Sequence, residues 1–286
     1  MTRRVWLRAG ALGLIVVGVI AGLTVYFSSE SVPPCGVSGV PTWHPPTAGP
    51  AHRFAVVFPD RAACFFAVDD KQRLIAQLRL EDAHDISTVA PNGDEVALRT
   101  ANGPYTLDLR TGKLARGGLA PFDTGTLTAV DPRQHVMYVT QRGLLGFRVL
   151  DMRTGATTYT IHFKGFTWNP RFGPNPPSHG VSLAPDRPEL WVLDAPNHAL
   201  HVFDVSAVPS TPPRRIDDVR LERTLTQPGS LTPTADGRYL YVGNAGDVID
   251  SQTQKSIANL PALQQANAVL EVEWVDGRPV FPGFPR

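Results

Sequence analysis

From about residue 50 onward, short apolar runs alternate with clusters of Pro, Gly, Asp and Asn, and no segment has a convincing amphipathic helical pattern. Several of the apolar runs are short stretches of aromatic, aliphatic and β-branched residues that alternate, as in Tyr239–Val242, and this pattern is typical of strands. The pattern therefore predicts an all-β domain of many short strands joined by tight turns.

A strand, a tight turn and a second strand recur along this domain. The unit occurs at 89–98, 130–139, 183–192 and 234–242, with a degraded copy at 58–65. Pro presets φ in such turns, Asn or Asp bonds its own backbone, and Gly takes positive φ. A second turn, marked by Asp108, Asp151, Asp204 or Asp250, follows each clear copy. Two hairpins in a fixed order predict a four-stranded antiparallel unit, which is the blade of a β-propeller.

The segment Thr234–Asn244, TADGRYLYVGN, resembles the strand-turn-strand signature of YVTN-repeat β-propellers. The segment 172–181, together with Trp191 and the segments 201–204, 248–250 and 270–280, is similar to a bacterial, membrane-anchored branch of that family. The resemblance covers residues 84 to 280 and implies a fold but no function. We expect six blades, with seven as the alternative. The first and last strands of such rings often share a blade, so Phe54–Phe58 is a candidate to pair with the C-terminal strands.

The N-terminus carries a different pattern. Three arginines precede an uncharged apolar run, Ala9–Phe27, which is long enough for a helix to cross a bilayer. The basic flank places the N-terminus in the cytoplasm and the remainder outside. We therefore expect a cytoplasmic basic tail at 1–8, a transmembrane signal-anchor at 9–27, a Pro-rich tether at 28–50 and the propeller at 51–286. The localisation expected is the cell membrane, single-pass, with an extracytoplasmic propeller.

Two questions about this N-terminal region stay open at the level of sequence. No cleavage site follows Phe27, which favours a retained anchor, although Thr2–Arg8 also looks like a twin-arginine export signal. Cys35 and Cys64 both fall outside the membrane in this topology, where disulfides persist. A bridge would join the tether to the first blade, but Cys64 lies in an apolar run where a buried thiol is equally plausible.

Composition narrows the range of partners. The chain carries 27 basic and 26 acidic side chains, a formal net charge of +1. Such a balance gives no reason to expect a nucleic acid partner. No phosphate-binding loop, Cys-x-x-Cys-His site or Gly-x-Ser-x-Gly motif occurs. We predict no catalytic residue, no metal ion and no cofactor, although the missing Cys-x-x-Cys-His site argues only against covalently attached c-type haem.

Candidate ligand-binding residues come from the repeat alignment and from one long loop. Asp85, Thr126, His179 and Gly229 occupy equivalent positions before the first turn of each unit, and His84 neighbours Asp85. One His and one Asp fall short of the ligand set that a transition metal requires, so a hydrogen-bonded channel residue is the simpler interpretation. The irregular stretch 164–178 carries Trp168 and Arg171, which are residue types enriched in binding hot spots. The competing interpretation is a loop whose aromatic residues plug the central channel or cover a gap between blades.

The sequence is consistent with two functions. The first is a non-catalytic binding or scaffold module for a protein, glycan or small molecule, attached to the membrane by its N-terminal helix. The second is an extracytoplasmic metal- or cofactor-dependent oxidoreductase of the quinoprotein kind, or a lactonase-like hydrolase. The absence of a recognisable catalytic set favours the binding module. The enzyme hypothesis rests largely on fold analogy, which is a poor guide to chemistry.

Overall fold

The computed structural model describes residues 38–46, 51–59, 64–81, 83, 86, 88–92, 94–117, 128–171, 176–223, 225, 229–264 and 266–282. All of them belong to one compact unit, Val32–Arg286. The predicted anchor at 9–27 lies outside the described residues. Among the residues described, no helix combines the length and apolarity needed to cross a membrane.

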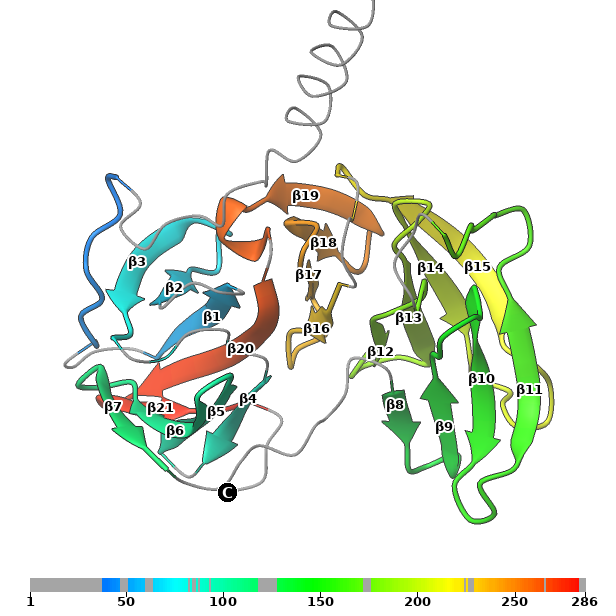
Figure 1. Cartoon of the computed structure of the whole chain (residues 1–286), viewed down its shortest axis with the longest axis horizontal. Coiled ribbons are helices and arrows are strands. Elements are labelled where there is room, and N and C mark those ends of the chain that lie inside the picture. Colours follow the sequence, from blue (N-terminus) through cyan, green and yellow to red (C-terminus); the bar gives the residue numbers. More distant parts are fainter. Residues whose placement is uncertain are drawn as a thin grey trace, which may run out of the picture. The chain divides into compact units, whose positions relative to one another are not determined.

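Four of the sheets formed by the described residues are antiparallel and four-stranded, like propeller blades (Figure 1). Their strands are β4 (Thr88–Asn92), β5 (Glu95–Thr100), β6 (Gly103–Asp108) and β7 (Lys113–Arg116); β8 (Thr128–Asp131), β9 (Val136–Val139), β10 (Gly146–Asp151) and β11 (Thr157–His162); β12 (Val181–Leu183), β13 (Glu189–Asp194), β14 (Ala199–Asp204) and β15 (Arg214–Arg220); and β16 (Leu231–Pro233), β17 (Tyr239–Val242), β18 (Asp247–Asp250) and β19 (Lys255–Asn259). Each of the four clear predicted repeats lies in the first hairpin of one such sheet. The predicted all-β, blade-like architecture is confirmed.

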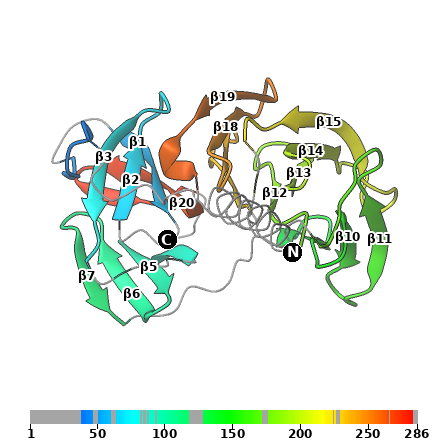
Figure 2. The same ribbon diagram turned by 45° about the horizontal axis from the view of Figure 1, so that its top comes forward.

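The fifth sheet joins the two ends of the domain. Its order is β21-β20-β1-β2-β3, where β1 is His52–Pro59, β2 is Cys64–Val68, β3 is Leu74–Arg79, β20 is Ala266–Val275 and β21 is Arg278–Val280. A short 3-10 helix, Pro261–Leu263, precedes β20. Strand β1 pairs with β20 over its whole length, from His52↔Trp274 to Pro59↔Ala266. The expected pairing of Phe54–Phe58 with the C-terminal strands is confirmed, and both views show these strands side by side (Figure 2).

This shared sheet corrects the expected number of blades. The degraded repeat at 58–65 and the closing strands near residue 272 count as two blades in the sequence. They are one sheet in the structure, because β1 pairs with β2 on one side and with β20 on the other. The described residues consequently form five sheets rather than six.

Successive sheets pack through shared apolar layers. The strands β8, β12, β16, β20 and β4 lie next to one another in that order. One apolar cluster joins the sheets of β8–β11 and β12–β15, and a second joins those of β12–β15 and β16–β19. Two more lie on the two faces of the shared sheet. Burying each large aliphatic or aromatic side chain in these layers contributes about 1.5–3 kcal/mol, so the interfaces between sheets contribute substantially to the stability of the fold.

Part of the predicted tether belongs to the domain. Trp43 is buried, and its Nε1 donates to the carbonyl of Leu109 at 3.0 Å. Its ring makes edge contacts with Phe54, Phe65 and Trp274. Residues 38–46 therefore pack on the sheets and do not act as a free linker. Composition could not show this, because the prolines nearby suggest an extended chain whether or not one tryptophan docks.

Both alternatives for the cysteines, a Cys35–Cys64 disulfide and a buried Cys64 thiol, stay open. Cys64 is fully buried on β2, in the apolar cluster that also contains Phe66 and Val248. Cys35 lies outside the described residues, so its pairing with Cys64 stays a prediction.

Candidate functional site

A cleft of roughly 360 Å³ opens between the shared sheet and the sheet of β16–β19. The start of β1, the turn between β2 and β3, the turn between β16 and β17, and the middle of β20 supply its walls. Its lining comprises Ala51, His52, Arg53, Phe54, Ala55, Val68, Asp69, Asp70, Gln72, Thr234, Asp236, Arg238, Tyr239, Tyr241 and Glu271. Charged, amide and phenol groups thus converge on an opening whose lining also includes Phe54 and Val68.

Strand alternation explains why Glu271 faces this cleft. On β20, Leu270, Val272 and Trp274 enter the apolar cluster on one face of the sheet. Glu271 therefore points to the opposite face. Its partner across the β1–β20 ladder is Ala55, whose small side chain leaves the glutamate room. The alternation is visible in the sequence, but the small partner depends on the pairing with β1.

An arginine lies between two carboxylates at this opening. Arg53 Nη1 donates to Asp236 Oδ2 at 2.5 Å, and Arg53 Nε lies 3.2 Å from Glu271 Oε1. Glu271 Oε2 accepts a hydrogen bond from the main-chain nitrogen of Ala235 at 2.5 Å. Strand β1, strand β20 and the β16–β17 turn are joined through these contacts.

Burial and hydrogen bonding act differently on the two carboxyls. Burial raises the pKa of Glu271 above its ordinary value, although the Ala235 amide and Arg53 oppose that shift. Burial also acts to raise the pKa of Asp236, but hydrogen bonds from Thr234 and Arg238 and the charge of Arg53 outweigh it and lower the pKa. The structure therefore disfavours charge on Glu271 and favours charge on Asp236.

Two buried acceptor atoms in the cleft lining have no hydrogen-bond partner. They are Oε1 of Gln72 and Oε1 of Glu271, and both residues are less than one-tenth exposed. The contact of the Glu271 atom with Arg53 is close enough for an ion pair but lacks hydrogen-bond geometry. A buried polar atom without a hydrogen bond costs about 1–3 kcal/mol. Such atoms in a cleft are the feature that a bound donor would satisfy.

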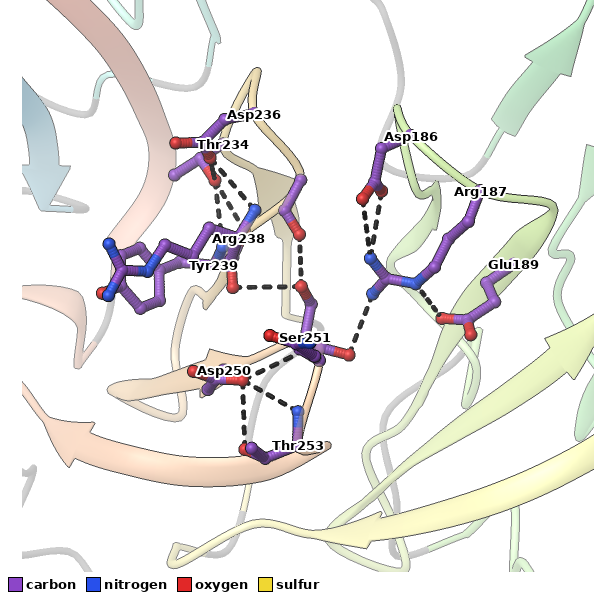
Figure 3. A network of polar contacts seen from close by, with 12 residues as sticks. Asp186, Arg187, Glu189, Thr234, Asp236, Arg238, Tyr239, Asp250, Ser251 and Thr253 are labelled. Atoms are coloured by element: carbon purple, nitrogen blue, oxygen red, sulfur yellow. Dashed lines mark hydrogen bonds and ion pairs between the residues drawn. The ribbon is translucent and has the colours of Figure 1, made fainter.

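Aromatic groups complete the wall. The guanidinium carbon of Arg238 lies 4.9 Å from the centre of the Tyr239 ring, and Figure 3 shows the two side chains beside each other. Tyr241 is buried, and burial raises the pKa of its phenol, which also hydrogen-bonds with the Gln72 side chain. The phenol stays a neutral hydrogen-bonding group at physiological pH.

A second polar cluster surrounds His201, in which His201 and Asp194 are fully buried and Asp218 is partly exposed. His201 Nδ1 lies 2.6 Å from Asp218 Oδ1, and Nε2 lies 3.1 Å from Asp194 Oδ2. Because a carboxylate only accepts hydrogen bonds, the ring donates to both when it carries two protons. Asn197 donates a hydrogen bond to Asp194, and the ring of Phe166 makes an edge contact with the imidazole, with 4.5 Å between the ring centroids. With neither His201 nor Asp194 exposed, we assign this cluster to holding β13, β14 and β15 together.

The residues expected from the sequence are distributed as follows. His179 is half-buried and its Nδ1 lies 2.6 Å from the carbonyl of Gly229, the equivalent position of the next repeat. Trp168 is half-buried and Arg171 is exposed, whereas Phe166 of the same loop packs on the His201 cluster. His84, Asp85 and Thr126 lie outside the described residues. A ligand-binding role for His179, Trp168 and Arg171 stays a prediction.

Sequence reasoning did not identify Arg53, Gln72, Asp236 or Glu271 as site residues. The available signal was the alternation Leu-Glu-Val-Glu-Trp-Val at 270–275, which places acids on one face of the last long strand. Within the part of the chain that the structure describes, no group of three or more His, Cys, Asp or Glu is arranged to hold a metal ion.

Comparisons with known proteins show no matching family model and no matching curated protein. Among solved structures, the chain is similar to hydrazine synthase of Kuenenia stuttgartiensis, with 17% identity, 63% of this chain and 51% of that one covered, and a TM-score of 0.37. It is similar to dihydro-haem d1 dehydrogenase NirN in complex with DHE, with 18% identity, 79% and 46% covered, and a TM-score of 0.35. A third is the β-propeller domain of Cps50 (Swd1) from Myceliophteria thermophila, with 17% identity, 63% and 57% covered, and a TM-score of 0.33.

The chain spans about half the length of the first two proteins. Likenesses at such TM-scores carry no argument about this chain's chemistry. The interpretation of the site therefore rests on its own residues.

Proposed function

We propose that this chain is a binding module of the YVTN-repeat β-propeller kind, which holds a small ligand in the cleft between β1, β20 and the β16–β17 turn. The cleft carries the proposal, because two buried acceptor atoms without hydrogen bonds line an opening of small-molecule size. Ligand sites combine an apolar enclosure with a few placed polar groups, and this cleft has both.

The proposal includes display outside the cytoplasm. Arg3, Arg4 and Arg8 precede the apolar run Ala9–Phe27, and this order supports an N-terminal anchor with the blades on the far side. The anchor would keep the binding cleft close to the outer surface of the membrane, where the module could collect or present its ligand.

Blocking the cleft tests the binding function. Ala51 is exposed at the cleft entrance, so Ala51→Trp fills the opening without removing a polar contact. Ala101, an exposed turn residue of another sheet, gives the matched control Ala101→Trp. Each protein, purified full-length in detergent, is screened by thermal unfolding against a collection of small polar metabolites.

A ligand present at one hundred times its Kd stabilises the folded state by about 2.7 kcal/mol. We expect at least one compound to raise the Tm of the wild type and of Ala101→Trp but not of Ala51→Trp. Equal stabilisation of all three proteins would place binding elsewhere, and no stabilising compound would contradict the proposal. A reporter fused after residue 286 tests the display, since activity of that reporter in the cytoplasm would overturn the topology.

A further inference from the structure

The charge of the cleft lining points to the class of ligand. Arg53 is flanked by two carboxylates, those of Glu271 and Asp236. Asp69 already forms an ion pair with Arg73, whose Nη2 lies 2.6 Å from its Oδ2. Asp70 and Arg238 offset each other in formal charge. The lining with its flanking Arg73 thus holds one more carboxylate than guanidinium groups.

The hydrogen-bonding groups of the cleft also favour a ligand that donates hydrogen bonds. The deep atoms that lack hydrogen bonds, Gln72 Oε1 and Glu271 Oε1, are both acceptors. Of the nearby donors, Arg53 already uses Nη1 on Asp236 and Nε in its ion pair with Glu271, and the exposed Arg238 lies over the Tyr239 ring. A ligand that brings donors satisfies the deep acceptor atoms, whereas a ligand that brings only acceptors leaves them without hydrogen bonds.

A positively charged donor suits this environment better than a neutral one. Hydrogen bonds from an ammonium or guanidinium group to a carboxylate are shorter and about twice as strong as neutral ones. Such a group would also cancel the excess negative charge of a partly desolvated site, where an uncompensated charge is costly. Tyr241 adds an aromatic surface for the cation and its hydrocarbon stem, whereas the ring of Tyr239 already lies against Arg238.

We propose that the cleft binds the ammonium or guanidinium end of a small organic cation, with Glu271 and Gln72 as its acceptors. This inference rests on the proposed function, since it names the ligand class of the same cleft. Glu271 is its central contact, and Arg53 and Asp236 hold that carboxylate in place.

Isothermal titration of the full-length protein in detergent tests the inference with three probes of similar size. L-arginine methyl ester is the cation, glutarate is the anion and glucose is the neutral polyol. Glu271→Gln keeps the side-chain shape and an acceptor for the Ala235 amide but removes the charge. Glu95→Gln removes one carboxylate from β5, outside the cleft, and is the matched control.

We expect the wild type and Glu95→Gln to bind L-arginine methyl ester equally, and Glu271→Gln to bind it at least tenfold more weakly. The affinity of the wild type should fall with added salt, because a charge pair is screened. Unchanged binding by Glu271→Gln, or no binding of the cation by the wild type, would overturn the inference. Tighter binding of glutarate or glucose, blocked by Ala51→Trp, would also overturn it and leave the binding module intact. If the proposed function itself is wrong, Ala51→Trp will leave the binding of every ligand unchanged.

Discussion

Arg187 crosses from one sheet to the next: its Nη2 donates to the main-chain carbonyl of Ser251 at 2.9 Å (Figure 3). The same guanidinium contacts Glu189 and Asp186 beside it. Gln134 stands at the equivalent place in the preceding repeat, and its Nε2 donates to the carbonyl of Val205 at 2.9 Å. The first turn of one unit thus contacts the second turn of the next unit at two successive interfaces.

Removal of the Arg187 side chain should weaken one of these interfaces. A hydrogen bond from a charged group contributes about 1.5–3 kcal/mol, so we expect Arg187→Ala to lower the free energy of unfolding by that amount. Arg153 is an exposed turn arginine, and Arg153→Ala should change stability by less than about 0.5 kcal/mol. Chemical denaturation of both variants measures the difference. Equal values would show that the contact with Ser251 contributes nothing.

Gly237 combines a positive φ with a close neighbour. Its φ is +69°, and a Cβ at this position would come within 2.4 Å of Asp186 Oδ1 in the adjacent sheet. Gly155 has nearly the same φ, +70°, but nothing within 4 Å. We expect Gly155→Ala to cost about 1 kcal/mol through backbone strain alone and Gly237→Ala to cost measurably more. Thermal unfolding compares them, and an equal loss would refute the predicted crowding by Asp186.

Positive φ at these glycines was predictable, because Asp and Thr before a Gly specify the turn chemistry at 151–155 and at 234–237. The aspartates of the second turns were also predictable as caps. Hydrogen bonds from the Thr154 amide lower the pKa of Asp151, and those from Thr253 lower that of Asp250. Local patterns determine such turns within a few residues, so no knowledge of the tertiary structure is needed.

The shared sheet and the cleft were harder to predict. The pairing of β1 with β20 was expected, but the sequence did not show that it merges two counted blades into one. The cleft needs Arg53, Gln72, Asp236 and Glu271, which are far apart in the chain. Their meeting depends on the strand register and on the packing of two sheets, and single-sequence periodicity contains neither.

The buried cluster at His201 makes a separate prediction. Replacing His201 by Leu leaves Asp194 buried without its ring partner, and breaking a buried pair in this way costs about 3–5 kcal/mol. The double variant Asp194→Asn/His201→Leu should recover part of the loss, because no buried carboxylate remains uncompensated. His162 on β11 is exposed, so His162→Leu is the control. Urea denaturation tests the set, and a double variant no more stable than the single one would contradict this assignment.

The pH dependence of stability should have opposite signs at two carboxyls. The pKa of Glu271 is raised from 4.5 by burial, so ionisation is disfavoured in the folded state. That penalty is absent below about pH 4.5 and complete above the folded pKa. Glu271→Gln should therefore be at least as stable as the wild type at pH 7, with the difference vanishing in acid.

Asp250 gives the contrasting case. Hydrogen bonds from the Thr253 amide lower its pKa from 3.8, so its charge adds stability above that value, and the stability is lost as the pH falls through the folded pKa. Asp250→Asn should be less stable than the wild type at pH 7 and should converge with it in acid. Denaturation at pH 7 and pH 3 measures both variants. A Glu271→Gln protein clearly less stable than the wild type at pH 7 would mean that the carboxylate stabilises the fold.

Hydrogen exchange of the full-length protein, with and without a ligand found in the thermal screen, tests the central claim most directly. The account predicts that the ligand slows exchange at 52–55, 69–72 and 234–241, the segments that line the cleft. Protection confined to 164–171 and 176–180 would instead place binding at the loop of Trp168, Arg171 and His179, and would contradict the assignment of the cleft as the ligand site.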